Sequence, residues 1–517
     1  MSSAHPQKGL SLASLSLSLP ADLAQAVKLQ RESWDAAGNT QRLWQKDAGW
    51  LTIVEEQLAN VSRFKSFAAG IAEDGFAHFV VLGMGGASLC ADLFGRSFGK
   101  QPNAPQMAVL NSAEPAEIRA LRAKIDPART LFCVSSKSGH LQYFYEETRK
   151  TVGGTAAGQH FIAISDPGSK LEIMAQELGF RRAYHGVPGL DERYSALSDF
   201  GLIPHAGMGL DTERFLKRSQ LMVKACQGTD AAANPGVSLG LVLATAAREF
   251  GRDKVTLICS PALRSFGAWV EQLLAEVCGL IPVDCEPLLT PDHYGSDRIF
   301  AYVHAASDGG DPNGNLVAAL EKAGQPVIRI GLKDLYDLGQ AIFQWQIATA
   351  VAASILGVNL FREPEPEASA LAAEEPILSP ALGGLIRKHL DCMKPKDYFG
   401  LLAYLPMFPE HEAALQEIRG TILEAKKAAT ILRFGPRFLP GNDMDSGVFL
   451  QITCEETDDL AIPGHEYTFG AVKAAQAQSD FQALAERHRR VLRVHLGKDV
   501  KAGLARLRDL VCAAVAH

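Results

Sequence analysis

Short apolar runs alternate with longer amphipathic stretches through the first half of the chain. Between residues 75 and 210 the apolar runs are 79–82, 107–110, 131–134 and 161–164. Runs that are apolar at every position predict strands buried on both faces, and the amphipathic stretches between them predict helices. We therefore expect a parallel sheet covered by helices.

A second alternation of the same kind begins near residue 235. It predicts strands at 255–259, 298–303 and 327–330, with helices at 264–278, 314–323 and 338–357. The stretch 347–361 is the longest apolar one, yet it is too short to cross a bilayer of about 30 Å, so we expect a buried helix. The similar build of the two halves predicts two related α/β domains, although no clean sequence repeat is visible.

The two ends of the chain have different patterns. Leucine and serine alternate over 10–19, which superficially resembles a signal peptide but has low apolar density, so we expect a loosely ordered lead and no export. Apolar residues over 21–70 recur with helical spacing, so we expect helices there. Near the other end, 363–375 has the composition of a linker and 376–435 is expected to be mainly helical. The segments 447–453 and 490–496 are predicted to be strands. The expected division is a helical arm (1–74), two α/β domains (75–230 and 231–365) and a C-terminal α+β extension (366–517).

Composition and charge narrow the class of function. The 517 residues are 47% hydrophobic, and the net charge of −7 without any lysine or arginine run argues against a nucleic-acid surface. The nine cysteines are scattered and odd in number, with no C-x-x-C pair, which favours the reducing cytoplasm. Histidine and cysteine spacings typical of zinc are absent, so we expect no metal and no cofactor. The expected partner is a small molecule, not a nucleic acid or a membrane.

Two loops have the composition of phosphate cradles. The first predicted strand ends at 83–88 (G-M-G-G-A-S), and the strand 131–134 runs into 135–139 (S-S-K-S-G). A strand that stops at glycines and hydroxyl residues where a helix begins offers backbone N–H groups and a positive dipole end to an anion. Neither G-x-G-x-x-G nor G-K-[ST] spacing is present, so a sugar phosphate is the better hypothesis than a nucleotide. The expected binding residues are Gly85, Gly86, Ser88, Ser136, Lys137 and Ser138.

Candidate catalytic groups lie in both alternations. Trp269, Leu273 and Glu276 fall at i, i+4 and i+7 of a predicted helix, so Glu276 would face the interior, where desolvation makes a carboxylate a usable general base. The alternative is a Glu276 paired with an arginine or turned to solvent. Arg193 could hold an enediolate or a phosphate, but the two acids before it make a local salt bridge at least as good an interpretation.

Two histidines, His140 and His304, are candidates for acid catalysis, with a structural role as the alternative for each.

Several motifs together resemble the phosphoglucose isomerases, specifically the isomerase half of bifunctional transaldolase/phosphoglucose isomerase proteins, from about residue 40 to the end. The matching segments are 165–172 (S-D-P-G-S-K-L-E), 193–198 (R-Y-S-A-L-S), 200–202, 269–273, 294–298, 435–439 (G-P-R-F-L) and 447–453. The resemblance implies two sugar isomerase (SIS-type) domains, a homodimer, and interconversion of glucose 6-phosphate and fructose 6-phosphate through a cis-enediol. It also implies Glu276 as the general base, Arg193 as the transition-state arginine, and 136–138 with Gly85 and Gly86 as phosphate loops.

The same comparison exposes departures from the family pattern. Ala87 replaces a loop serine, His140 and Leu141 replace two threonines, Asp191 and Glu192 replace two glycines, and Ala370 stands where a lysine is expected. The sequences after Glu276 (Val277, Cys278, Gly279) and at 440–443 also differ. Each lost hydrogen bond to phosphate costs roughly 1.5–3 kcal/mol, so three lost donors weaken binding on the order of a thousandfold.

Two hypotheses follow from this conflict. The first is an aldose–ketose isomerase of phosphohexoses. The alternative is a catalytically impaired homologue that acts as a sugar-phosphate sensor, a scaffold or a regulatory subunit.

Overall fold

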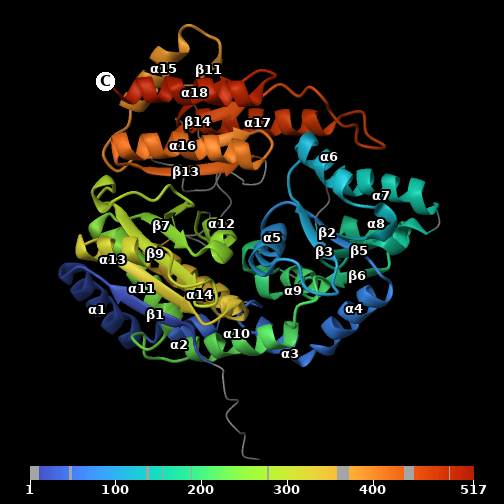
Figure 1. The fold of residues 1–517 in the computed structure, drawn as a ribbon. Helices are drawn as coiled ribbons and strands as arrows, with labels where there is room; N and C mark the ends of the chain where they lie inside the picture. The colour runs from blue at the N-terminus through green and yellow to red at the C-terminus, as the bar shows by residue number, and fades with distance from the viewer. Residues whose placement is uncertain are drawn as a thin grey trace, which may run out of the picture.

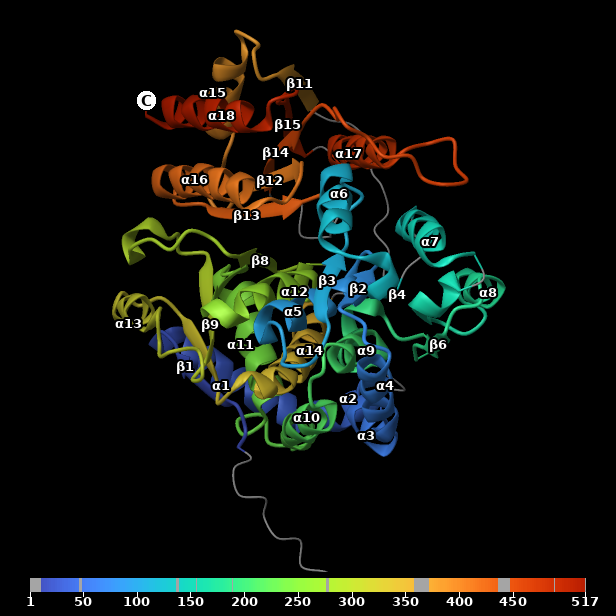
Figure 2. The same ribbon diagram turned by 45° about the vertical axis from the view of Figure 1, so that its right-hand side comes forward.

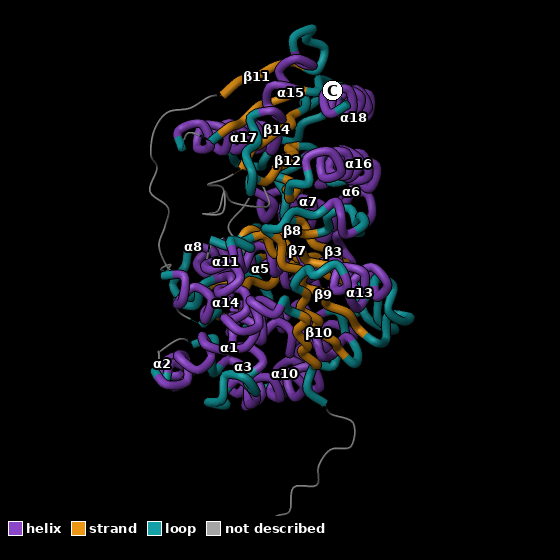
Figure 3. The backbone as a smooth tube through the Cα atoms, turned by 90° about the vertical axis from the view of Figure 1, so that its left-hand side faces the viewer, coloured by secondary structure: helices purple, strands orange, loops and turns teal. Residues whose placement is uncertain are grey.

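The computed structural model describes residues 11–45, 49–135, 139–154, 156–187, 189–275, 279–357, 372–435, 447–487 and 489–516. These residues form three five-stranded sheets. Strands run through the middle of the molecule with helices on either side (Figure 3). The α/β fold class, with parallel sheets flanked by helices, is confirmed.

The first sheet is parallel throughout and has the order β3-β2-β4-β5-β6. Its strands are β2 (His78–Leu82), β3 (Gln106–Leu110), β4 (Thr130–Val134), β5 (Phe161–Ser165) and β6 (Arg182–His185). The helices α5 (Gly86–Phe98), α6 (Pro115–Lys124), α7 (Gly139–Val152) and α8 (Lys170–Glu177) connect them. The four predicted strands are confirmed to within a residue, because β4 and β5 are buried at every position, as an all-apolar run requires.

The second sheet has the order β1-β10-β9-β7-β8. Its parallel strands are β7 (Lys254–Cys259), β8 (Ile281–Asp284), β9 (Arg298–Ala305) and β10 (Val327–Leu332). They alternate with α11 (Pro235–Phe250), α12 (Arg264–Ala275), α13 (Gly314–Lys322) and α14 (Leu338–Leu356). The expected buried helix at 347–361 is confirmed for 347–353, where α14 is buried at every position; 354–357 are partly or fully exposed, and 358–361 lie outside the described residues.

The N-terminal lead departs from its prediction. Residues Ser14–Ser18 form β1, which pairs antiparallel with β10 at the edge of the second sheet. The expectation of a loosely ordered lead is wrong for this segment, because the leucine–serine alternation has the period of two that places Leu15 and Leu17 on the core side of a strand.

Helices of the N-terminal arm and of the first unit join the two sheets into one core. They are α1 (Ala21–Ala36), α2 (Asn39–Trp44), α3 (Ile53–Ala59), α4 (Ser62–Glu73), α9 (Asp199–Gly207) and α10 (Thr212–Cys226). One contiguous apolar cluster runs from this arm through both sheets, so the two sheets lie beside each other on a shared core (Figure 1).

The C-terminal segment forms a third parallel sheet of order β11-β15-β14-β12-β13. Its strands are β11 (Ala372–Pro376), β12 (Tyr398–Tyr404), β13 (Ala429–Phe434), β14 (Gly447–Thr453) and β15 (Arg490–His495). Its helices are α15 (Leu382–Asp391), α16 (Pro409–Lys426), α17 (Phe469–Glu486) and α18 (Val500–Val515).

Three predictions for this segment need correction. It is an alternating α/β unit rather than an α+β extension, and 376–435 contains two strands rather than being mainly helical. The strand β12 was missed because it lies between β14 and β13 and is buried at all seven positions, so it has no polar alternation that would distinguish a strand from a buried helix in the sequence. The predicted strands 447–453 and 490–496 are confirmed, whereas the end of the predicted linker, 372–375, lies in β11.

In each sheet the strand order reverses next to an inner strand. In the first sheet β2 lies between β3 and β4, in the second β7 lies between β8 and β9, and in the third β12 lies between β13 and β14. In open α/β sheets ligands bind outside the carboxyl ends of the strands where the order reverses. The two predicted cradles follow β2 and β4, so they flank this reversal point in the first sheet.

Within the part of the chain that the structure describes, every helix is too short or too polar for a membrane span.

Candidate active-site cleft

The first cradle is a tight turn between β2 and α5. Gly85 precedes α5 with φ of 81° and ψ of −161°, a conformation that favours glycine. Ser88 is buried and its Oγ donates to the Gly85 carbonyl at 2.8 Å, so this hydroxyl stabilises the turn. The second loop starts beside the end of β2, because the Ser135 amide donates to the Leu82 carbonyl at 2.9 Å. The predicted phosphate-binding residues 136–138 lie outside the described residues.

Arg193 lies in a short 3₁₀ helix, η3 (Glu192–Leu197), and is held by its neighbour. Its backbone N–H donates to Asp191 Oδ1 at 3.0 Å, its Nε donates to the same oxygen at 2.6 Å, and Nη2 bonds Oδ2. This is the local salt bridge weighed as the alternative from the sequence. The paired carboxylate offsets much of the positive charge that the arginine would offer to a ligand.

Glu192 lies against the first cradle. A Cβ atom placed on Gly85 would lie 2.8 Å from Oε2 and 3.0 Å from Oε1 of Glu192, so only a glycine leaves room for this carboxylate. The N-terminus of a helix favours an anion. At the N-terminus of α5, the Glu192 carboxylate is that anion. Glu192 is exposed, so its carboxylate lies at the surface beside the cradle.

Helix α12 packs along α5 and brings the second unit to the cradle. Trp269 and Leu273 are buried, as the predicted apolar stripe requires. The Trp269 side chain hydrogen-bonds the Cys90 thiol of α5, and burial raises the pKa of that thiol to about 12, which leaves it unreactive at neutral pH. Glu276 lies outside the described residues, immediately beyond the described end of α12.

The C-terminal unit covers the start of α7, which follows the second cradle. A Cβ atom on Gly139 would lie 2.8 Å from Cδ1 of Ile462 and 3.2 Å from a ring carbon of Phe469. Leu141 is buried in the same apolar cluster as Ile462 and Phe469. The replacement of the two family threonines at 140 and 141 therefore has a physical reason, since these positions pack against another part of the chain.

His140 belongs to this packing rather than to catalysis. Its Nε2 lies 2.9 Å from the Ser112 carbonyl, and its ring stacks on Phe469 with centroids 5.4 Å apart. Burial lowers the pKa of the imidazole to about 4, so at pH 7 it is neutral rather than the imidazolium that would act as the acid. The prediction of His140 as a catalytic acid is wrong, and its structural alternative holds. His304 stacks on Tyr302 with centroids 5.0 Å apart.

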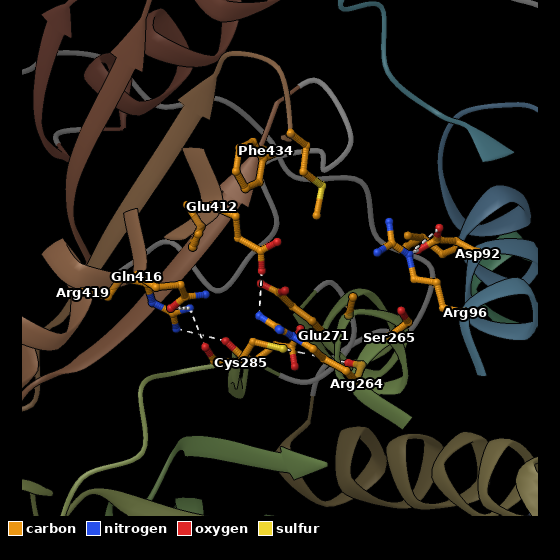
Figure 4. A pocket seen from close by; sticks show the side chains of 15 residues that line it. Asp92, Arg96, Arg264, Ser265, Glu271, Cys285, Glu412, Gln416, Arg419 and Phe434 are labelled. Atoms are coloured by element: carbon orange, nitrogen blue, oxygen red, sulfur yellow. Dashed lines mark hydrogen bonds and ion pairs between the residues drawn. The ribbon is translucent and has the colours of Figure 1, made fainter. Parts of the chain in front are cut away.

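A cavity of about 150 Å³ lies farther along the α5–α12 seam, where the C-terminal unit packs on it (Figure 4). Arg264 pairs with Glu412 at 2.8 Å, and Glu271 pairs with Arg433 at 2.9 Å; both pairs join α12 to the C-terminal unit. Sequence reasoning missed Glu271, although it lies two residues before the predicted stripe position 273. Because both arginines are paired with carboxylates, we interpret this cavity as a gap in the interface between α12 and the C-terminal unit, which the ion pairs hold together.

A buried carboxyl lines the same cavity. Burial, and then the charge of Glu271, raise the pKa of Asp284 to about 7. Arg419 donates to the carbonyls of Asp284 and Cys285 at 3.0 and 3.1 Å, which fastens α16 to the end of β8.

Comparison with known proteins gives partial matches. No protein-family model matches the chain. It is 27% identical over 247 residues to the glucose-6-phosphate isomerase of Carboxydothermus hydrogenoformans, covering 44% of this chain and 51% of that protein. It is also 27% identical over 212 residues to the glucose-6-phosphate isomerase of a Cyanothece strain, covering 40% of each protein. The chain thus spans about half the length of these curated relatives.

Among solved structures, a hypothetical protein from Thermus thermophilus superposes with a TM-score of 0.57 at 21% identity, covering 68% of this chain and 96% of that protein. This likeness shows a shared fold. The resemblance drawn from the motifs is confirmed by the sequence matches alone: over part of its length the chain is similar to glucose-6-phosphate isomerases.

Proposed function

We propose that the cleft at the carboxyl edge of the first sheet binds a phosphosugar and interconverts its aldose and ketose forms, with glucose 6-phosphate and fructose 6-phosphate as substrates. The observation that carries this proposal is the place of the two glycine- and serine-rich sequence segments, directly after β2 and β4; the Ser135–Leu82 hydrogen bond joins the carboxyl ends of these strands at the reversal point of the sheet. The relatives named glucose-6-phosphate isomerase support the substrate class.

In the proposed reaction Glu276 is the general base. It takes the proton from C2 of the open-chain aldose and returns it to C1, while the hydroxyl proton on O2 passes to O1; the C1 aldehyde becomes an alcohol and the C2 alcohol becomes the ketone, without gain or loss of atoms. Arg193 stabilises the negative charge of the intermediate enediolate. Gly85, Gly86, Ser88, Ser136, Lys137 and Ser138 hold the phosphate or shape its loops.

A second candidate is favoured by the contacts around these groups. Glu192 borders the cradle with a negative charge, Asp191 holds Arg193, and the C-terminal unit covers the start of α7. Each contact lowers the affinity for an anion or the stabilisation of an enediolate. These contacts support a catalytically impaired homologue that senses a sugar phosphate or regulates a partner.

A coupled assay for the conversion of fructose 6-phosphate separates the two candidates. Turnover that is lost in Glu276→Gln but kept in the matched variant Glu177→Gln supports the isomerase. Stabilisation of the fold by fructose 6-phosphate without turnover at high protein concentration supports the sensor. If neither turnover nor binding is found, the proposed function is refuted.

The proposal extends to a homodimer in the cytoplasm. The dimer rests on the resemblance, and the compartment rests on the cysteines, since all eight that the structure describes are free thiols. Measurement of the molar mass in solution tests the dimer.

A further inference from the structure

The third sheet has a cavity at its own reversal point. The carboxyl ends of β12, β14 and β15 supply Tyr404, Thr453 and His495 to a cavity of about 270 Å³, and α17 closes one side with Lys473 and Ala474. Small-molecule pockets start at about 300 Å³ and occur at such reversal points in α/β sheets. The cavity therefore has the place and nearly the size of a ligand site.

The charges around Lys473 exclude a charged ligand. Its Nζ lies 2.8 Å from Glu114 Oε2, 2.9 Å from Glu456 Oε2 and 4.0 Å from Cys454 Sγ, and its side chain is only 5% exposed. A bound anion would face the carboxylate of Glu456 in the lining, and it would find Lys473 already neutralised by Glu456 and by Glu114 behind it. A bound cation would face the ammonium group of Lys473, so an uncharged ligand is the one that fits.

Arg493 also lines the cavity, but it serves as part of the wall. Its Nε donates to Gln451 at 2.6 Å, its Nη2 to the Ala477 carbonyl at 2.9 Å, and its Nη1 to Gln478 Oε1 at 2.7 Å. A guanidinium bonded through all three nitrogens is not an open fork for a carboxylate or a phosphate.

The remaining polar groups both donate and accept. Thr453 Oγ1 and His495 Nδ1 lie 3.0 Å apart, and Gln478, which accepts from Arg493 through its oxygen, keeps its NH₂ as a donor. Glu456 supplies a carboxylate acceptor on the same side as Lys473. Hydroxyl groups match this mixture, because each one can accept from a lysine or an amide and donate to a carboxylate.

We propose that this cavity binds an uncharged polyhydroxy compound, a sugar or a sugar alcohol of up to about hexose size. The site is separate from the proposed active-site cleft and does not depend on it. The wall of the cavity is joined to the first unit, because α17 contacts that unit directly: Lys473 bonds Glu114 at the N-terminus of α6, and Phe469 stacks on His140 beside the second cradle. Figure 2 shows α17 lying next to α6.

The test is ligand-observed NMR titration of the full chain with D-glucose and D-glucitol. In Ala474→Phe an exposed alanine of the cavity wall is replaced by a ring that fills the space, whereas Ala475→Phe places the same ring on the neighbouring exposed position of α17 outside the lining. We expect saturable binding of at least one compound, a Kd raised tenfold or more in Ala474→Phe, and a Kd within twofold of the parent in Ala475→Phe.

Two results overturn the proposal. One is the absence of saturable binding of both compounds to the parent protein. The other is binding that Ala474→Phe leaves unchanged, which would place the sugar elsewhere, for example in the active-site cleft. If Ala474→Phe does not fold, as judged by its thermal transition, Thr453→Val replaces it as the cavity variant with the same expected loss.

Discussion

Replacement of Glu192 by glutamine should strengthen the binding of a phosphosugar. The side chain keeps its size and loses its negative charge, which lies against Gly85 at the start of α5. Two unit charges about 4 Å apart repel by about 1 kcal/mol in water, and Glu192 is exposed, so water-like screening applies. A phosphate carries about −1.5 to −2 charges at neutral pH. The repulsion is therefore about 2 kcal/mol, which is roughly thirtyfold in Kd.

The assay is isothermal titration of fructose 6-phosphate into the parent protein and Glu192→Gln at low ionic strength. The matched control is Glu177→Gln, because Glu177 is exposed at the end of α8, where the helix has returned to the amino edge of the sheet. The control should bind like the parent. Added salt should shrink the difference between parent and Glu192→Gln, since the Debye length falls to about 8 Å at physiological ionic strength.

Equal affinity of the parent and Glu192→Gln at low ionic strength would refute the reasoning about Glu192. A similar gain in Glu177→Gln would also refute it, because the effect would then come from net charge rather than from a carboxylate at the cradle.

Three further predictions concern the cradle and the C-terminal unit. Lys473→Met leaves the buried Glu114 without its counter-charge and should lower the free energy of unfolding by about 3–5 kcal/mol in a urea titration. Burial raises the pKa of the Asp480 carboxyl in α17 to about 6, so the folded protein binds the carboxyl proton more tightly than the unfolded chain. The free energy of unfolding therefore falls as the pH rises from about 4 to 6. Because Asp480→Asn cannot titrate, it should lack about 3 kcal/mol of this fall. Gly85→Ala places a methyl group at φ of 81° against Glu192 and should cost about 1–3 kcal/mol of stability, measured by thermal unfolding.

Controls for these variants come from the same elements. Lys501→Met changes an exposed lysine of α18 and should leave stability within about 0.5 kcal/mol. Stability of Asp480→Asn that falls with pH as steeply as in the parent would contradict the assignment to Asp480. Gly99→Ala is the reference for glycine, since Gly99 also has positive φ but would have no neighbour within 4 Å of its Cβ; equal losses in both variants would show that Glu192 adds nothing.

The sequence predicts the fold well where the pattern is local. The runs that became β2, β4 and β5 are apolar at nearly every position because both faces of those strands are covered, and this burial is visible in the sequence itself. The β1 strand escaped prediction because five residues of leucine and serine have too little apolar content to mark a strand without its partner β10. Tertiary pairing decides such an edge strand.

The cleft was only partly predictable for a similar reason. The salt bridge between Arg193 and Asp191 was among the sequence hypotheses because the two residues are neighbours along the chain. The contact of Lys473 with Glu114 joins residues 359 positions apart, and no local pattern carries it. The packing of Ile462 on Gly139 also joins residues that are far apart in the sequence. From the sequence alone, the replacement of the family threonines at 140 and 141 therefore looked like the loss of an active-site motif, whereas the structure shows that these positions pack against the C-terminal unit.

The most direct test of the central claim is a crystal structure of the protein soaked with fructose 6-phosphate. The account predicts phosphate density between the loops that follow β2 and β4, within hydrogen-bond distance of backbone N–H groups at the start of α5 or α7. Phosphate density at another place, with this cleft empty at a saturating concentration of ligand, would contradict it.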